Sequence, residues 1–89
     1  PHVGWNKTNI SNDNPIFKNI KNEELFYYNH SYCVQKINDP KFKILASCNY
    51  GDNFVSIGFK KNIYGIQPHP EKSQKQGLVF LENFIKEKC

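Results

Sequence analysis

An apolar stripe at helical spacing near the C-terminus limits the folds that this chain can adopt. Apolar residues recur every three or four positions over 74–88, a period that predicts an amphipathic helix. Ser73, with Gln76 three positions later, matches a capping box at the start of such a helix. An apolar helix face needs a sheet or another helix to cover it, so we expect strands earlier in the chain. The stripe consists of Leu78, Leu81, Phe84 and Ile85.

The segments before this helix alternate between strand patterns and turns. The aromatic-rich segment 25–34 predicts one strand. Alternating apolar residues over 42–50 and 54–59 predict a hairpin with a tight turn at 51–53, and a short apolar strand is expected over 63–67. Residues 1–24 are polar and rich in turn formers, with a helical turn expected after Pro15. The order of elements indicates a mixed α/β arrangement.

Composition excludes several classes of protein. The chain has 89 residues, enough for one domain at most or for part of one. All twelve cationic side chains are lysines, which argues against the reading of base edges in nucleic acid, where arginine is the usual residue. No apolar run approaches the roughly 18 residues that a membrane span needs. Three cysteines without zinc-ligand spacing indicate reduced thiols in a cytoplasmic protein and no metal site.

The most informative segment is 67–73, which reads QPHPEKS. Each proline disfavours helix at the residue before it, so the segment is expected to be extended. His69 and Glu71, two positions apart, then point to the same side, and we expect a Glu71 carboxylate oxygen within hydrogen-bond reach of a His69 ring nitrogen. A carboxylate beside an imidazole forms the base half of a nucleophile–base–acid triad. The alternative is a turn histidine followed by a first-turn helix acid.

Several blocks of the sequence carry a family resemblance. Residues 64–73, YGIQPHPEKS, resemble the signature around the catalytic histidine and glutamate of class I (triad) glutamine amidotransferases. Residues 1–6, PHVGWN, and 26–32, FYYNHSY, are similar to segments of the glutaminase subunits of imidazole glycerol phosphate synthases. Further similar blocks follow in the same order at 50–54 and 77–84, so the resemblance covers essentially the whole chain.

The resemblance implies an α/β fold: the C-terminal half of a class I glutaminase three-layer αβα (flavodoxin-like) domain, with a β-hairpin and a C-terminal amphipathic helix. Residues 1–89 would be the C-terminal part of a single glutamine amidotransferase domain, and the start at Pro1 suggests that an upstream part lies elsewhere. The family's nucleophile is a cysteine framed by glycines, a frame that Cys33, Cys48 and Cys89 all lack. We therefore expect a Cys-His-Glu glutaminase in the full subunit, and no activity from this chain alone because the N-terminal half with the nucleophile is absent.

The resemblance also implies roles for particular residues. His69 matches the general base and Glu71 the third member of the triad. Ser31 and Tyr32 match the segment whose backbone helps to bind the carboxylate of L-glutamine. No cofactor is implied.

Two protein partners are implied, with neither nucleic acid nor membrane: the N-terminal half of the same glutaminase, and a cyclase or synthase subunit built as a (β/α)8-barrel. Trp5, Tyr27 and Lys72 match positions that face the cyclase near the mouth of the ammonia passage. The ammonia would enter histidine biosynthesis. His2 and His30 are expected to be structural histidines.

Two alternatives stay open at the level of sequence. A paralogous glutaminase subunit could supply ammonia to a sugar amidotransferase, because the glutaminase chemistry is the same. A non-catalytic interaction module could retain the His-Pro-Glu segment without using it. Without the upstream strands that the resemblance implies, the apolar stripe of the helix and the strand over 63–67 are expected to lack part of their cover.

Overall fold

The computed structural model describes residues 1–35, 37–61 and 63–88. Its five strands form one sheet with the order β2-β1-β3-β4-β5, and every neighbouring pair is antiparallel. The elements, with 3-10 helices labelled η, are β1 (His2–Ile10), η1 (Pro15–Phe17), β2 (Glu24–His30), β3 (Lys43–Tyr50), β4 (Asp52–Lys60), β5 (Ile63–Ile66), η2 (Pro70–Lys72) and α1 (Gln74–Lys88).

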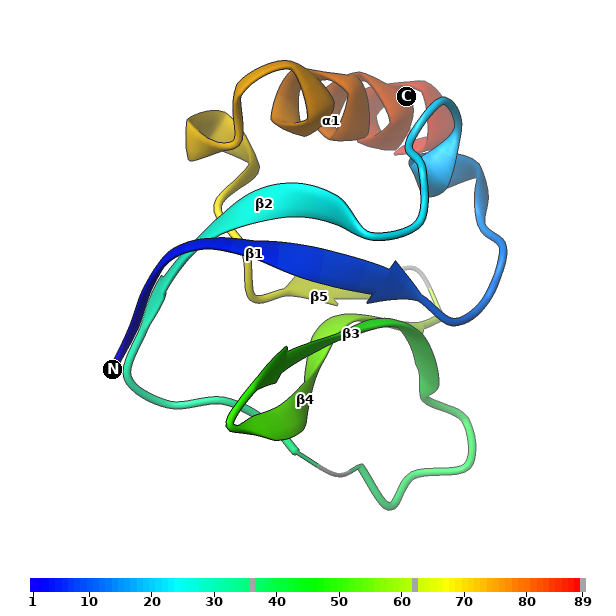
Figure 1. The fold of residues 1–89 in the computed structure, drawn as a ribbon. Helices are drawn as coiled ribbons and strands as arrows, with labels where there is room; N and C mark the ends of the chain where they lie inside the picture. Colours follow the sequence, from blue (N-terminus) through cyan, green and yellow to red (C-terminus); the bar gives the residue numbers. More distant parts are fainter. Residues whose placement is uncertain (36, 62, 89) are drawn as a thin grey trace.

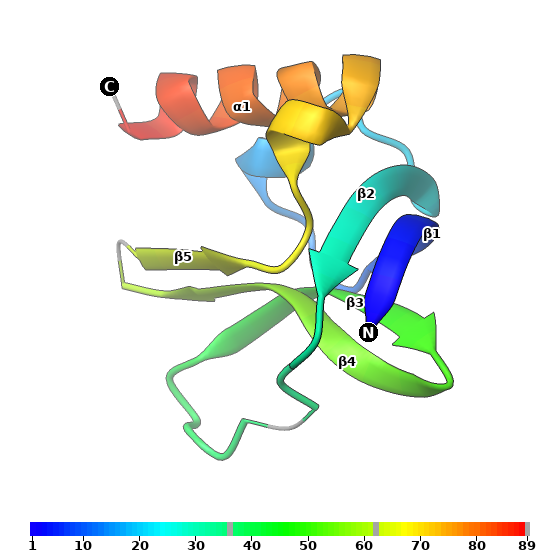
Figure 2. The ribbon, with the colours of Figure 1, turned by 90° about the vertical axis from the view of Figure 1, so that its left-hand side faces the viewer.

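The helix α1 lies on one side of the molecule, above the two edge strands β2 and β5 of the curled sheet, while the β3–β4 hairpin lies away from it (Figures 1 and 2). It contacts η1, η2 and β2. Phe80 and Phe84 of α1 also pack directly on the sheet, against the rings of Phe26 in β2 and Tyr64 in β5. This mixed arrangement confirms the α/β class, and in this segment the helical layer covers one side of the curled sheet.

The predicted hairpin, the short strand and the helix are all present, at β3–β4, β5 and α1. The aromatic strand is shorter than predicted, because β2 ends at His30 and residues 31–35 leave the sheet. β1 was not predicted at all. Its fully buried positions are His2 and Thr8, which are polar, so β1 lacks the apolar alternation by which a strand is recognised.

The core contains a chain of three hydroxyls as well as apolar side chains. The Tyr28 hydroxyl lies 2.5 Å from Thr8 Oγ1 and 2.7 Å from Ser56 Oγ, so it joins β1, β2 and β4. Burial raises the pKa of Tyr28, and the phenol therefore stays neutral. The surrounding apolar cluster is formed by Ile16, Phe17, Phe26, Tyr28, Leu45, Ala46, Cys48, Phe54, Ile57 and Phe80.

The helix presents a different face to the core from the one predicted. Leu78 and Ile85 are 62% and 57% exposed, whereas Phe80 and Asn83 are buried. Asn83 Nδ2 donates to the carbonyls of Ile16 and Lys18, which ties α1 to η1. Because α1 is apolar on two neighbouring sides, spacing alone did not show which side faces inward. The exposure of Leu78 and Ile85 agrees with the expectation that part of the stripe lacks cover.

The predicted capping box is wrong. The Ser73 hydroxyl donates to the His69 carbonyl and accepts from the Tyr27 N–H, and the Gln76 side chain donates to the Leu25 carbonyl. Both side chains therefore connect the helix start to β2 and to the preceding loop. A tertiary hydrogen bond to an edge strand has replaced the local one.

Gly77 allows α1 to lie very close to η2. A Cβ atom at this position would lie 1.9 Å from the carbonyl oxygen of Pro70, a contact that backbone movement alone could relieve. By contrast, a Cβ at Gly65 in β5 would meet no atom within 4 Å. The two glycines therefore form a matched pair, one at a close approach and one in open space.

We predict that Gly77→Ala lowers the free energy of unfolding by roughly 1–3 kcal/mol, because the methyl group forces α1 away from η2. Gly65→Ala should change it by less than about 0.5 kcal/mol. Urea unfolding of both variants measures the difference. Equal stability of the two would contradict the close packing of α1 on η2.

Candidate active site

The segment between β5 and α1 is a stiff, extended loop. Pro68 and Pro70 are both buried, and His69 between them has extended backbone angles, with φ −102° and ψ 94°. The proline rings fix φ and so remove conformations in which the loop could swing away from the sheet. At the loop start, the Gln67 N–H donates to the Ser56 carbonyl of β4 at 2.8 Å.

The loop forms hydrogen bonds with the free edge of β2, which is one of the two edge strands of the sheet. The His69 N–H donates to the Tyr27 carbonyl at 2.8 Å, and the Tyr27 N–H donates to Ser73 Oγ at 2.9 Å. Ser73, which is completely buried, in turn donates its hydroxyl hydrogen to the His69 carbonyl at 2.6 Å. Both backbone groups of Tyr27 and both of His69 are thus satisfied within one small network, and this network sets the position of His69.

His69 and Glu71 form the contact predicted from their spacing. His69 Nδ1 lies 3.0 Å from Glu71 Oε2, and the two side chains are 36% and 59% exposed. A carboxylate can only accept, so the hydrogen is assigned to Nδ1, and the Nε2 lone pair of the neutral ring stays available to take a proton. The hydrogen bond from His69 lowers the pKa of Glu71, which keeps this carboxylate ionised at neutral pH.

Ser31 and Tyr32 lie just beyond the end of β2, and both are exposed. His30 Nδ1 lies 3.1 Å from the Tyr32 carbonyl oxygen, and the Val34 carbonyl accepts from the Val55 N–H of β4 at 2.7 Å. Tyr27, which holds His69, is four residues before Ser31. At about 3.3 Å per residue these parts of β2 are on the order of 13 Å apart along the strand.

Trp5, Tyr27 and Lys72 form one continuous surface cluster. Trp5 and Tyr27 are directly opposite in the β1–β2 pair, and their rings meet edge to face with centroids 5.8 Å apart. Lys72 Nζ lies 5.9 Å from the Tyr27 ring centroid, within the range of a cation–π contact. Trp5 is 43% exposed. The structure thus brings together three residues that lie far apart in the sequence.

Two residues in this site have roles that the sequence did not predict. Ser73 holds the loop on β2, and Tyr27 carries both the loop and the aromatic cluster. The only sequence signal for Ser73 is that it lies four positions after His69, beyond a proline, and this signal also fits the capping box. His2 and His30, expected to be structural, lie against one another and are considered further below.

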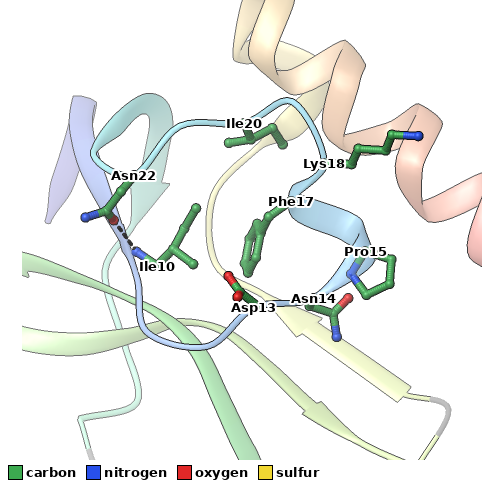
Figure 3. A pocket seen from close by; sticks show the side chains of 8 residues that line it. All are labelled: Ile10, Asp13, Asn14, Pro15, Phe17, Lys18, Ile20 and Asn22. Carbon is green, nitrogen blue, oxygen red and sulfur yellow. Dashed lines mark hydrogen bonds between the residues drawn. The ribbon is translucent and has the colours of Figure 1, made fainter.

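Other parts of the described structure are weaker candidates for a functional site. A hollow of about 590 Å³ lies inside the loop that connects β1 to β2 (Figure 3). None of the residues assigned to the candidate active site lines it. Among the described residues, no group of three histidine, cysteine or acidic side chains could hold a metal ion, and no helix could cross a membrane. Cys33 is exposed and Cys48 is buried, both as free thiols, while Cys89 lies outside the described residues.

The fold and the His-Glu loop define a class of protein. The sequence model of the family described as "Glutamine amidotransferase class-I" matches residues 1–88, and the chain belongs to this family. Among solved structures, a protein of Thermoplasma acidophilum assigned to GMP synthase superimposes with a TM-score of 0.75 at 27% identity. The match covers 97% of this chain and 43% of that one.

More similar sequences carry the name of one particular enzyme subunit. Imidazole glycerol phosphate synthase subunit HisH 1 of Methanococcus maripaludis is 48% identical over 85 residues, and subunit HisH of Pelagibacter ubique is 47% identical over 85 residues. Each alignment covers 96% of this chain. The chain spans about two fifths of the length of these relatives, namely 41% and 40%.

We predict that the Glu71 carboxylate titrates below its usual range and that His69→Ala raises its pKa toward that range, since His69 is the largest cause of the lowering. Because the pKa is lowered in the folded protein, the stabilisation from the pair is complete above the usual carboxyl range and is lost as the pH falls through the lowered pKa. A carbon-13 NMR titration of the Glu71 carboxyl measures both midpoints. Identical midpoints in the two proteins would contradict the hydrogen bond.

Proposed function

We propose that this chain supplies the histidine and glutamate of a Cys-His-Glu glutaminase site, which hydrolyses glutamine to glutamate and ammonia. The observation that carries the proposal is the His69–Glu71 hydrogen bond on a loop fixed to the edge of β2. The network around Tyr27 and Ser73 fixes the backbone of His69, and none of the described residues forms a hydrogen bond with its Nε2. Family membership and the names of the similar subunits support the same chemistry.

In this proposal His69 Nε2 takes the proton of a cysteine thiol, and Glu71 stabilises the imidazolium that forms. The thiolate attacks the side-chain amide carbon of glutamine, and the imidazolium returns the proton to the leaving ammonia. Water, activated by the same imidazole, then cleaves the thioester and releases glutamate. The cysteine would come from the part of the domain that the relatives contain beyond the matched segment, because Cys48 is buried in the core cluster and neither Cys33 nor Cys89 has the flanking glycines of the family's nucleophile.

We also propose that residues 1–89 are part of a single glutamine amidotransferase domain and depend on the rest of it for cover. Apolar side chains are exposed on both β5 and α1, where Ile63 is 72% and Leu78 62% exposed. Such a surface costs about 25 cal/mol for each Å² left in water. A hollow of about 160 Å³ also lies between β5 and α1, where Tyr64, Ile66 and Phe84 are among the residues that line it. This surface is suited to packing against further strands or helices of the domain.

Ser31 and Tyr32 are proposed to bind the carboxylate of the substrate glutamine through backbone groups. Their position beyond the end of β2 supports this, since it leaves the backbone of the 31–32 segment in contact with solvent. The distance along β2 from Tyr27 also leaves room for a substrate that extends from its carboxylate to the amide beside His69. The free thiols of Cys33 and Cys48 fit a reducing compartment such as the cytoplasm.

Trp5, Tyr27 and Lys72 are proposed to contact a (β/α)8-barrel cyclase subunit that receives the ammonia in histidine biosynthesis. The names of the similar subunits support this choice of partner. Trp5 is exposed and Tyr27 is half-buried, and such aromatic residues are the kind that interface centres favour; Lys72 lies beside them. Tyr27 is hydrogen-bonded to His69, so this surface lies next to the proposed catalytic base.

We predict that His69→Ala, made in the complete domain with its partner subunit, lowers ammonia release from glutamine by at least about 10³-fold, because the cysteine thiol loses its base. Lys75→Ala, at an exposed position on α1, is the control and should leave the rate unchanged. The 89-residue chain alone should release no ammonia. Near-normal turnover by His69→Ala would exclude His69 as the base and favour a non-catalytic role for the motif.

A further inference from the structure

His2 and His30 form a hydrogen-bonded pair at the end of the sheet where the 31–35 segment begins. The two residues are opposite one another in the β1–β2 register, and His2 Nδ1 lies 3.1 Å from His30 Nε2. The His2 ring is 4% exposed and stacks on the rings of Tyr28 and Tyr50, with centroids 5.0 and 4.1 Å away. Its plane is therefore fixed by packing.

The pair is part of a chain of hydrogen bonds in which the donor and the acceptor of each bond can be assigned in only one way. At one end, His30 Nδ1 lies 3.1 Å from the Tyr32 carbonyl, which can only accept, so His30 carries its hydrogen on Nδ1. A neutral His30 then accepts at Nε2, and His2 must donate from Nδ1. At the other end, His2 Nε2 accepts from Asn6 Nδ2 at 3.4 Å.

The orientation of the Asn6 amide is fixed independently. Asn6 Nδ2 also donates to the Asn49 carbonyl at 2.9 Å, and Asn6 Oδ1 accepts from the Lys7 N–H at 2.8 Å. Flipping this amide would lose both bonds. Burial and the nearby His30 lower the pKa of His2, which agrees with a neutral ring that shares one proton with His30. Both ends of the chain therefore require the same tautomers.

We propose that His2 is a positioning residue for substrate glutamine: it holds His30 in the Nδ1–H tautomer, and His30 thereby fixes the Tyr32 carbonyl and the 31–32 backbone. This inference rests on the proposed function, which assigns that backbone to the glutamine carboxylate. A neutral imidazole can carry its hydrogen on either nitrogen, and the hydrogen bond at one nitrogen decides the other. Without His2, the Nε2–H tautomer becomes available to His30, and this tautomer cannot donate to Tyr32.

The bond to Tyr32 restricts the very residues that the substrate would meet. It links a side chain to a carbonyl two positions later, and the small ring that it closes contains the backbone of Ser31 and Tyr32. Each peptide unit is planar, so the only freedom in this ring lies in the φ and ψ angles of the residues that it contains. Holding the Tyr32 carbonyl therefore restricts the directions of the Ser31 and Tyr32 N–H groups as well. A pre-set donor binds a carboxylate without the cost of ordering the segment first.

The test is a double-mutant cycle in the complete domain with its partner subunit. His2→Phe keeps a flat ring for stacking on Tyr28 and Tyr50 but removes the hydrogen bond to His30. His30→Asn places an amide NH2 near the position of Nδ1, so it can still donate to Tyr32 and has no tautomers. His2→Phe should raise KM for glutamine roughly three- to tenfold, the equivalent of one hydrogen bond, with kcat unchanged.

In the His30→Asn background, His2→Phe should leave KM unchanged, because the asparagine amide needs no partner to fix its donor. The same rise in KM in both backgrounds would show that His2 acts through packing and would overturn the proposal. No rise in either background would also overturn it. Loss of activity in His69→Ala together with an unchanged KM in His2→Phe would reject this inference alone, whereas activity in His69→Ala would reject the proposed function.

The tautomers can be measured without any activity. Long-range proton–nitrogen NMR spectra of the unaltered protein should show the hydrogen on Nδ1 in both His2 and His30. In His2→Phe, the His30 signals should move toward those of the Nε2–H tautomer. A hydrogen found on Nε2 of His30 in the unaltered protein would overturn the proposal whatever the kinetic result.

Discussion

The candidate active site depends on one small network of hydrogen bonds at the free edge of β2. An edge strand leaves backbone groups without a partner, and here the Tyr27 N–H and carbonyl are taken up by Ser73 and His69. Ser73 Oγ also donates to the His69 carbonyl, so a single buried hydroxyl closes the network. The prolines on either side of His69 reduce the entropy that the loop would lose on docking. Together these features place the imidazole beside Glu71.

Tyr27 connects this network to the surface that we propose for the partner subunit. Its backbone groups point away from β1, so its pairing with Trp5 is of the non-hydrogen-bonded kind, in which side chains lie closer together. The Trp5 ring contacts one part of the Tyr27 ring, and Lys72, from the loop that carries His69, lies over it. A subunit that docks on Trp5 and Lys72 would also contact Tyr27, whose backbone is hydrogen-bonded to the proposed base, His69. The His2–His30 pair plays a comparable part at the other end of β2, where it orders the segment proposed to hold the substrate carboxylate.

The parts of this molecule that follow local rules were predictable from sequence. Proline stiffness and the two-residue spacing were enough to predict the His69–Glu71 contact, and alternation was enough for the β3–β4 hairpin. β1 was missed because its fully buried residues, His2 and Thr8, are polar and are satisfied by partners from other elements. The predicted inward face of α1 was wrong because two residues of the actual inward face, Gly77 and Asn83, are not apolar. Gly77 faces η2 and Asn83 faces η1. Ser73 matched a local cap, but its hydroxyl is bonded to a strand 46 positions earlier in the sequence. Each of these misses concerns a polar group or a glycine, whose contacts an apolar pattern does not reveal.

The central claim, that the Ser73 hydroxyl holds the His69 loop on β2, is tested most directly by amide hydrogen exchange in a Ser73→Ala variant. Loss of the hydroxyl leaves the Tyr27 N–H without its acceptor and removes one of the two donors to the His69 carbonyl, which keeps its bond from the Lys72 N–H, at a cost of about 1–3 kcal/mol. The account predicts that the His69 amide then exchanges roughly tenfold or more faster, while amides in the β3–β4 hairpin keep their protection. An unchanged exchange rate at His69 would show that the loop is held in place without Ser73 and would contradict the account.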